Sequence, residues 1–431
     1  MAKMGSDQIT APKLGELSHE PGSSGSSRAI SRRSLLFGAA GATAGGLVGA
    51  VPGVAQGTEL LAAGRPPLWK QAERKGIVFG SSIATWQLDP QYKRLHGHEA
   101  ALLWPEDDLL WYQLKPTPES PLDFSHGDRI FAFARKHHQL RIGNFLVWDE
   151  GFGEGWQDSD LWDITARRAK RLLYGTARKL VHHYKGTLKA WIVANEVTDP
   201  EGDKHGLRTN VPWYNTIGPS YIRRVFQIAK EHDPKALRVL NEFGFETVNQ
   251  YGDTAAARRR AFLKAIDHLM CHDVPIEAVG IQGHLLAEDF HTRFHETAYR
   301  RFLQDLQDRG LKILITEMDV LDDGLPKAPH VRDRKVADVY RHFLDVALDE
   351  PAVKAVIAFG LTDRYTWLEE DYPRDDGAHR RPLAFDRHMK VKPAYFAISH
   401  SFRHAPHRRM LWRLEKHQST AFEGGSASVV R

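Results

Sequence analysis

Two glutamates follow apolar runs and are the residues of this chain best suited to chemistry. Glu196 comes directly after the run 190–194 and the amide Asn195. Glu317 lies in a second such stretch, 312–320. Because the strands of a parallel α/β barrel deliver polar residues to one rim, we expect both carboxyl groups to meet there. Such a pair can cleave an acetal, one carboxyl transferring protons and the other attacking carbon.

The rest of the chain alternates short apolar stretches with amphipathic ones. Eight strands, each followed by a helix, over ~330 residues match the count and length of a (β/α)8 TIM barrel. An open doubly wound sheet is the competing fold, but the stretch 76–80 lacks the second and third glycines of a dinucleotide-binding loop. We therefore predict a single (β/α)8 catalytic domain. The expected strands are 76–84, 108–114, 140–148, 188–197, 237–244, 278–285, 311–320 and 353–361, and the expected helices include 125–138, 162–184, 219–232, 254–272, 292–309 and 331–348.

Polar side chains end several other predicted strands as well. Burying so many of them in the last positions of hydrophobic strands would be costly unless they served a site. The neighbouring polar residues therefore strengthen the interpretation of the two glutamates as functional rather than as ion-paired rim residues. These closing residues are Asn144, Trp148, Asp149, Asn241, Glu242, Gln282, His284, Asp319 and Asp363.

The composition is that of a large globular protein and excludes several classes. Apolar residues make up 42% and charged residues 26% of the 431 positions. The net charge of +5 is small, and no basic stripe with interleaved aromatic residues is present, which argues against nucleic-acid binding. The single cysteine, Cys271, excludes an internal disulfide framework and any cysteine-based zinc cluster. We expect it to be a small buried residue of the helix 254–272.

Residues 1–60 have the composition of an export leader rather than of a folded domain. A polar segment precedes Arg32-Arg33, and an apolar run rich in Ala and Gly follows. This pattern looks like a bacterial twin-arginine signal and predicts export by that machinery to the periplasm or beyond. A permanent membrane span is the less favoured alternative, because the run is short and rich in glycine. We assign the barrel to 61–403, and a basic helix or arm followed by disorder to 404–431.

Four segments carry a family resemblance, WIVANEVTD at 191–199, VGIQGHL at 279–285, ITEMDV at 315–320 and FGLTDRYTW at 359–367. In this order they look like the strand four, six, seven and eight signatures of glycoside hydrolase family 10, which consists largely of endo-β-1,4-xylanases. The segments 143–148, 381–386 and 391–395 are similar to its third strand and its closing region. The resemblance extends from residue 76 to about residue 400.

The resemblance implies hydrolysis with retention of configuration by two carboxyl groups ~5–5.5 Å apart. Glu196 would protonate the leaving oxygen and later deprotonate water, and Glu317 would attack the anomeric carbon. His284 would hydrogen-bond the nucleophile, and Asn195 would bond the 2-hydroxyl of the sugar. We expect a polysaccharide substrate and no cofactor or metal. The other expected substrate-binding residues are Gln282, Trp148, Trp367, Asn144 and Phe359.

Several positions depart from the family pattern on the side that holds the non-reducing sugars. Asp107 replaces an asparagine, Leu110 a lysine, Asn144 a histidine and Phe359 a tryptophan. Each substrate hydroxyl left without a partner would cost ~1–3 kcal/mol of recognition. The residues therefore support the chemistry better than they identify the sugar.

Three functions stay open at this point. The first is an endo-β-1,4-glycosidase acting on xylan or a related β-linked chain, with the backbone of a bacterial exopolysaccharide as the alternative substrate. The second is a carbohydrate-binding barrel without turnover, against which the retention of both glutamates and His284 argues. The third is a metal-dependent barrel enzyme with Glu196, Glu242 and Glu317 as ligands, which would need more convergent ligands than His284. The sequence distinguishes neither endo from exo attack nor one oligomeric state from another.

Overall fold

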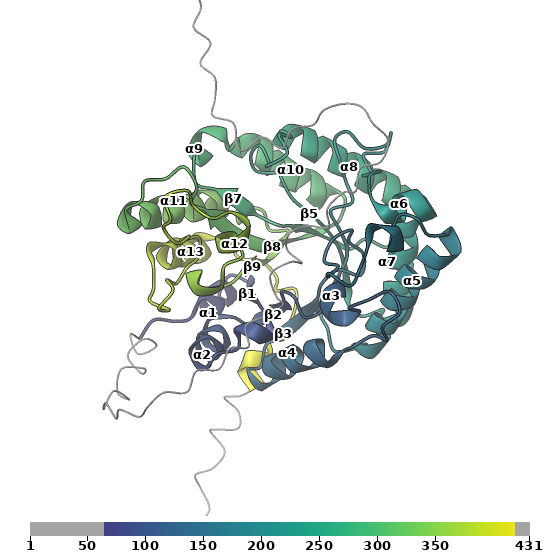
Figure 1. Ribbon diagram of the computed structural model, residues 1–431. Coiled ribbons are helices and arrows are strands. Elements are labelled where there is room, and N and C mark those ends of the chain that lie inside the picture. The colour runs from purple at the N-terminus through teal and green to yellow at the C-terminus, as the bar shows by residue number, and fades with distance from the viewer. Residues whose placement is uncertain (1–63, 419–431) are drawn as a thin grey trace, which may run out of the picture.

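The computed structural model describes residues 64–418, and within them parallel strands close into a barrel surrounded by helices (Figure 1). The strand order is β6-β5-β4-β3-β2-β1-β9-β8, and pairing of β6 with β8 closes the ring. The predicted TIM barrel is therefore confirmed. The strands are β1 (Val78–Ile83), β2 (Leu102–Pro105), β3 (Leu140–Gly143), β4 (Ala190–Asn195), β5 (Leu237–Glu242), β6 (Ala278–Ile281), β7 (His284–Leu286), β8 (Lys312–Leu321) and β9 (Val353–Ala358).

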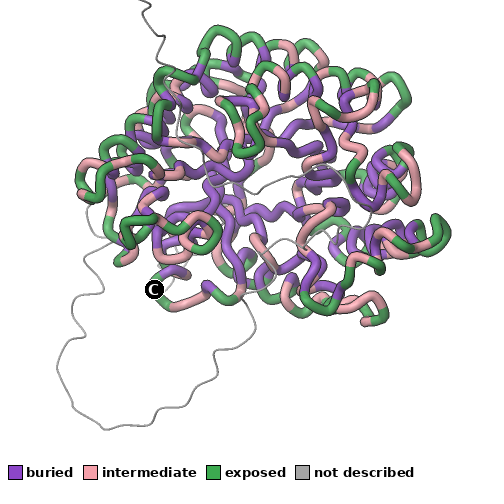
Figure 2. Tube along the Cα trace, turned by 45° about the horizontal axis from the view of Figure 1, so that its top comes forward, coloured by how far each residue is buried: buried purple, intermediate pink, exposed green. Residues whose placement is uncertain are grey.

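Alternate residues of the strands fill two separate cores. In β4, Ile192 points into the barrel interior with side chains such as Leu102 and Leu314, whereas Val193 packs outward against the helices. Figure 2 shows the buried chain gathered at the centre and exposed segments at the periphery. Because both faces of these strands are covered, their sequences are continuous apolar runs rather than alternating ones.

The six predicted helical stretches all contain helices. Thr165 and Thr254 cap the first turns of α5 and α8 through their side-chain oxygens, which satisfy backbone N–H groups there. The helices are α1 (Leu68–Glu73), α2 (Pro90–Glu99), α3 (Trp111–Leu114), α4 (Ser125–Lys136), α5 (Ala166–His183), α6 (Pro212–Ile217), α7 (Ser220–His232), α8 (Ala255–Cys271), α9 (Phe290–Arg293), α10 (Glu296–Asp308), α11 (Pro329–Ala347), α12 (Leu368–Asp371) and α13 (Pro393–His404).

The second strand was predicted at the wrong place. The strand is β2, and the stretch 108–114 forms a loop and the short helix α3. Its apolar residues serve a different purpose, since Trp111 packs against the rings of Phe152 and Trp156 at centroid distances of 5.2 and 5.5 Å. An aromatic cluster beside the barrel produces the same run of apolar letters as a strand, so the pattern alone was ambiguous.

The stretch 278–285, predicted as one strand, is divided between β6 and β7. Gly283 separates them with a backbone φ of 76°, a left-handed conformation that glycine adopts without strain. The long strand β8 pairs first with β6 and then with β7. The turn at Gly283 thus redirects the chain between Gln282 and His284, which both contribute to the site described below.

The residues after α13 form an arm across the N-terminal end of the barrel, one of the two forms expected for this segment. Leu414 is buried with the interior residues of the strands, and Glu415 pairs with Arg141 at 3.0 Å. The Arg408 guanidinium donates to four backbone carbonyls, those of Leu348, Glu350, Val353 and Pro406. The arm therefore closes the end of the barrel opposite to the strand ends that carry Glu196 and Glu317.

The leader predicted at 1–60 lies outside the described residues. Among the helices of 64–418, none combines the length and the apolar character needed to cross a bilayer.

Replacing Arg408 by alanine should lower the free energy of unfolding by about 1.5–3 kcal/mol, because hydrogen bonds from a charged group are lost and carbonyls are left without donors. Chemical denaturation followed by circular dichroism measures this change. Arg409→Ala is the matched control, because Arg409 is the exposed neighbour in the same arm. Equal losses in the two variants would contradict a specific role for the Arg408 contacts.

Candidate active site

Glu196 lies immediately after β4 and adopts a left-handed backbone conformation with φ of 55°. A non-glycine residue is held in this conformation only where its surroundings impose it, and here its amide donates to the Asn241 carbonyl at 3.1 Å. The carboxylate receives three hydrogen bonds. Asn195 and Gln282 donate to Oε1 at 3.0 and 2.9 Å, and the Trp148 indole donates to Oε2 at 3.1 Å.

Glu317 projects from β8 and is nearly buried, with 5% of its surface exposed. Asn241 Nδ2 donates to its Oε1 at 2.8 Å, and His284 Nε2 lies 3.3 Å from its Oε2. The backbone amide of Glu317 donates to the Gln282 carbonyl at 2.8 Å. Both carboxylate oxygens thus face nitrogen atoms, which fixes the orientation of the carboxylate.

Three amide side chains link the two carboxylates, and we call Asn195, Asn241 and Gln282 the amide network. Asn241 Nδ2 donates both to Glu317 and to Asn195 Oδ1, each at 2.8 Å. Asn195 in turn donates to Glu196, and Gln282 donates to both Asn195 and Glu196. Residues from β4, β5, β8 and the β6–β7 turn are therefore joined in one hydrogen-bonded group that contains both predicted catalytic residues.

Asn241 is a member of the site that the sequence did not single out. It was recognised as a polar strand end, but nothing in its position indicated a bond to Glu317. Gly280 on the adjacent strand β6 leaves the space for its amide, since a Cβ at that glycine would lie 2.0 Å from Asn241 Oδ1. Thr316 donates to the same oxygen at 2.7 Å, which fixes the orientation of the amide.

His284 is held between two carboxylates. Its Nδ1 lies 2.8 Å from Asp319 Oδ1, and its Nε2 faces Glu317. Burial opposes the charged imidazolium, but Asp319 and then Glu317 outweigh it and raise the pKa of His284 to about 10. His284 therefore carries a proton at neutral pH and donates from both ring nitrogens.

Asp319 also fixes a wall of the site. The Trp367 indole donates to its second oxygen at 2.7 Å. Asp319 and Glu317 are two residues apart on one strand, so their side chains lie on the same face. That spacing was the available signal for the role of Asp319, which the sequence analysis named only as a polar strand end.

The predicted aromatic residues do come together near these groups. Phe359 is buried, with its ring edge-on to His284 at 5.5 Å and to Trp367 at 6.1 Å. The Trp148 indole donates a hydrogen bond to Glu196. Asn144 differs, because it is fully buried and its one hydrogen bond within the described chain is a long one of 3.4 Å to the Glu106 carbonyl. The structure therefore does not join Asn144 to the amide network.

Glu242, a possible metal ligand in the third function considered above, is engaged elsewhere. Its carboxylate is fully buried, with Arg258 2.6 Å from one oxygen and the Thr198 hydroxyl and amide 2.6 and 3.0 Å from the other. This ion pair fixes the segment that follows Glu196. Both oxygens of Glu242 are thus already engaged by donors of the protein.

Arg208 is a further residue near the site that sequence analysis missed. It pairs with Asp149 at 3.0 Å and reaches the Glu196 carbonyl at 3.5 Å. Burial raises the pKa of Asp149 to about 6, although Arg208 opposes the shift. Arg208 lies in the loop between β4 and α6, where no periodic pattern indicates which side chain returns to the site.

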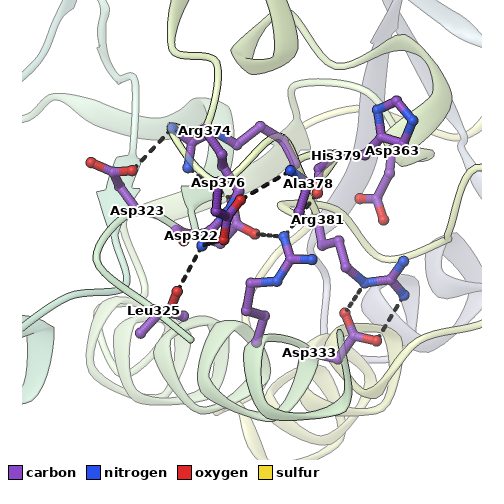
Figure 3. Close-up of polar contacts among 12 residues, drawn as sticks. Asp322, Asp323, Leu325, Asp333, Asp363, Arg374, Asp376, Ala378, His379 and Arg381 are labelled. Atoms are coloured by element: carbon purple, nitrogen blue, oxygen red, sulfur yellow. Dashed lines mark hydrogen bonds and ion pairs between the residues drawn. The ribbon is translucent and has the colours of Figure 1, made fainter. Parts of the chain in front are cut away.

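A group of ion pairs holds the long loop after β9, which carries Trp367. Arg381 forms a two-pronged pair with Asp333 of α11, and Asp363 lies nearby (Figure 3). Asp363 itself is fully buried, accepts from Lys392 Nζ at 2.9 Å, and has a pKa raised by burial to about 6. Asp363 thus supports the loop, since its carboxylate accepts from the Leu383 amide and from Lys392.

Comparisons with known proteins agree with this arrangement. The sequence profile of Glycosyl hydrolase family 10 matches residues 68–401. Endo-1,4-beta-xylanase B of Thermotoga neapolitana is 30% identical over 338 residues, which cover 77% of this chain and 90% of that protein. The crystal structure of native xylanase 10B from Thermotoga maritima matches with a TM-score of 0.68 at 30% identity, over 78% of this chain and 98% of that one. Xylanase 10B from Thermotoga petrophila RKU-1, in complex with xylobiose, matches with a TM-score of 0.68 at 29% identity, over 78% and 97%.

Asp319→Asn should lower the pKa of His284 by about 1–3 units, because burial then acts against the imidazolium with less opposition. NMR of labelled histidine over a pH titration measures this shift directly. The His284 contribution to folding is complete below pH 6.5 and is lost as the pH rises toward about 10. The variant should therefore lose this contribution at a lower pH.

Asp323→Asn is the control for this measurement, because Asp323 is a half-exposed carboxylate just after the same strand, paired with Arg380. If His284 titrates in its ordinary range in the native protein, the charge assignment of the site is wrong.

Proposed function

Because the chain belongs to glycosyl hydrolase family 10, we propose that it is an endo-β-1,4-glycosidase that cleaves xylan, or a closely related β-linked polysaccharide, with retention of configuration. The observation that carries the proposal is the amide network. It joins two glutamates from different strands while giving them different partners. Glu317 faces the protonated imidazole of His284, whereas the side chains that donate to Glu196 are neutral.

Glu317 is the proposed nucleophile. Its carboxylate attacks the anomeric carbon, and the bond from that carbon to the glycosidic oxygen breaks. The contacts with Asn241 and His284 hold this carboxylate in position before attack. Water then adds to the same carbon from the face that the leaving group vacated, and Glu317 is released as a carboxylate.

Glu196 is the proposed acid and base. Its Oε1 already accepts two amide hydrogen bonds, whereas Oε2 accepts one from Trp148. The proton therefore belongs on Oε2, from which it passes to the leaving oxygen. The same oxygen then removes a proton from the attacking water, as microscopic reversibility requires.

Asn195 is the proposed contact to the 2-hydroxyl of the reacting sugar. It lies between the two carboxylates in the network, with its nitrogen on Glu196 and its oxygen facing Asn241. A hydrogen bond from this position strengthens as positive charge develops on the sugar ring. Trp148 and Trp367 supply flat apolar faces for the sugar rings.

The identity of the sugar chain rests on the relatives, which are named as xylanases. The residues expected on the non-reducing side of the site differ from the family pattern. Leu110 is 7% exposed and offers no donor, and Asp107 accepts from the Trp86 indole at 2.8 Å. These substitutions favour a substrate that needs fewer contacts there, and the backbone of a bacterial exopolysaccharide is the alternative.

Export by the twin-arginine machinery completes the proposal. It rests on Arg32-Arg33 and the Ala- and Gly-rich run after them. The variant Arg32→Lys/Arg33→Lys should therefore be exported less than the native chain. If cell fractionation finds equal amounts of the two proteins outside the cytoplasm, the export proposal is wrong.

Glu317→Ala should reduce hydrolysis of both xylan and aryl xylosides to below about one hundredth of the native rate, because no covalent intermediate forms.

Glu196→Ala should impair the hydrolysis of xylan far more than that of aryl xylosides with good leaving groups, since these need no proton at the departing oxygen. Reducing-sugar release and chromophore release measure the two activities.

Glu201→Ala is the matched control, an exposed glutamate in the loop that follows Glu196. Unchanged circular dichroism in all three variants separates chemical from folding effects. Equal losses of both substrates in Glu196→Ala would contradict the acid role. Absence of sugar release from every β-glycan by the native protein would leave only the binding function.

A further inference from the structure

A second group of reactive side chains lies at the end of α8. Cys271 is exposed, contrary to the expectation of a buried residue. Two imidazoles accompany it, His268 one turn before and His272 directly after. Ligand atoms of these three residues all lie within 4.8 Å of one another. We call His268, Cys271 and His272 the α8 cluster.

The helix itself brings these residues together. Positions three and four residues apart occupy one face of an α-helix, so His268 faces both Cys271 and His272. Cys271 Sγ lies 3.2 Å from His272 Nδ1, and the rings of His268 and His272 have centroids 4.4 Å apart. Ligand atoms bound to one tetrahedral zinc ion are about 3.3–3.8 Å apart, given the usual zinc–sulfur and zinc–nitrogen distances. The widest separation among the ligand atoms, up to 4.8 Å, must therefore shrink by about 1–1.5 Å when a metal binds.

The surroundings favour a cation. The last carbonyls of a helix carry partial negative charge, and the α8 cluster lies at that end. The His268 carbonyl accepts from the Cys271 thiol at 3.1 Å and from His272 Nδ1 at 2.7 Å, and metal binding would replace both of these hydrogen bonds. The ring of His205, from the loop after β4, stacks on His268 with centroids 3.7 Å apart and covers one side of the cluster.

We propose that the α8 cluster binds a borderline divalent transition metal, with zinc as the representative ion, through one thiolate and two imidazoles. Thiolate and imidazole ligands together select this class over magnesium or calcium, which prefer oxygen. Binding releases the thiol proton to solvent and leaves both imidazoles neutral. The single cysteine excluded only a zinc cluster built from several cysteines, whereas this site needs one thiolate beside two imidazoles.

The inference is independent of the proposed hydrolase function. Within residues 64–418, no hydrogen bond or ring contact joins a side chain of the α8 cluster to the amide network. The site would nevertheless hold the end of α8 beside the loop that carries His205 and, three residues later, Arg208. Arg208 is the residue that pairs with Asp149 and reaches the Glu196 carbonyl.

Cobalt(II) titration of the full reduced chain tests the site, because a thiolate bound to cobalt gives a charge-transfer absorption band. The chain has one cysteine, so any such band comes from Cys271. We expect the band to saturate at one equivalent, to disappear on addition of zinc, and to be absent in Cys271→Ser. His268→Ala/His272→Ala should weaken cobalt binding at least about tenfold.

His400→Ala/His404→Ala is the matched control, since these residues also form a stacked pair four residues apart on a helix, at 3.9 Å, but without a thiol. It should leave the band unchanged. Absence of the band in the native chain, or its survival at full strength in His268→Ala/His272→Ala, would overturn the proposal. Circular dichroism without metal checks that each variant is folded. Calorimetry of zinc binding to Cys271→Ser is a second test. If this variant binds zinc as tightly as the native chain, the proposal is also overturned.

Discussion

The active site depends on the side-chain nitrogen of Asn241, which binds two partners at once. It donates to the Glu317 carboxylate and to the oxygen of Asn195, so Asn195 must turn its own nitrogen toward Glu196. The two glutamates are therefore oriented by the same set of amides and cannot shift independently. This requires β4, β5 and β8 to keep a common register at their ends, which a closed barrel enforces. An irregularity in the β4–β5 pairing between Ile192 and Ala194, and the left-handed backbone at Glu196, adjust where the first carboxylate points.

Several of the carboxylates around this network have a defined cationic partner. Glu317 and Asp319 share the imidazolium of His284, Glu242 has Arg258, and Asp149 has Arg208. Glu196 differs from these carboxylates because all of its side-chain donors within residues 64–418 are neutral, namely Trp148, Asn195 and Gln282. A carboxyl group that must gain and lose a proton in each cycle is best placed among neutral donors, since a bound cation would hold it ionised.

Sequence patterns predicted the barrel and the two glutamates because strand ends in such a fold are recognisable as apolar runs followed by polar residues. Gln282 and His284, two of the polar residues predicted at strand ends, lie within hydrogen-bonding distance of Glu196 and Glu317 respectively. It misplaced the second strand, because an aromatic cluster around Trp111 has the same apolar letters as a strand. It also missed Arg208 and the bond from Asn241, since both depend on how distant segments approach. Cys271 was expected to be buried, but it is the last residue of α8 and lies off the buried face that includes Leu269.

The most direct test of the paired-carboxyl geometry is proton NMR of the product during the first moments of hydrolysis, because the separation of the two groups determines the stereochemical outcome. Carboxyls ~5–5.5 Å apart predict that the new reducing end appears first as the β anomer, before mutarotation. First appearance of the α anomer would mean that water attacks directly across a wider gap, and the account of Glu317 as a nucleophile would be contradicted.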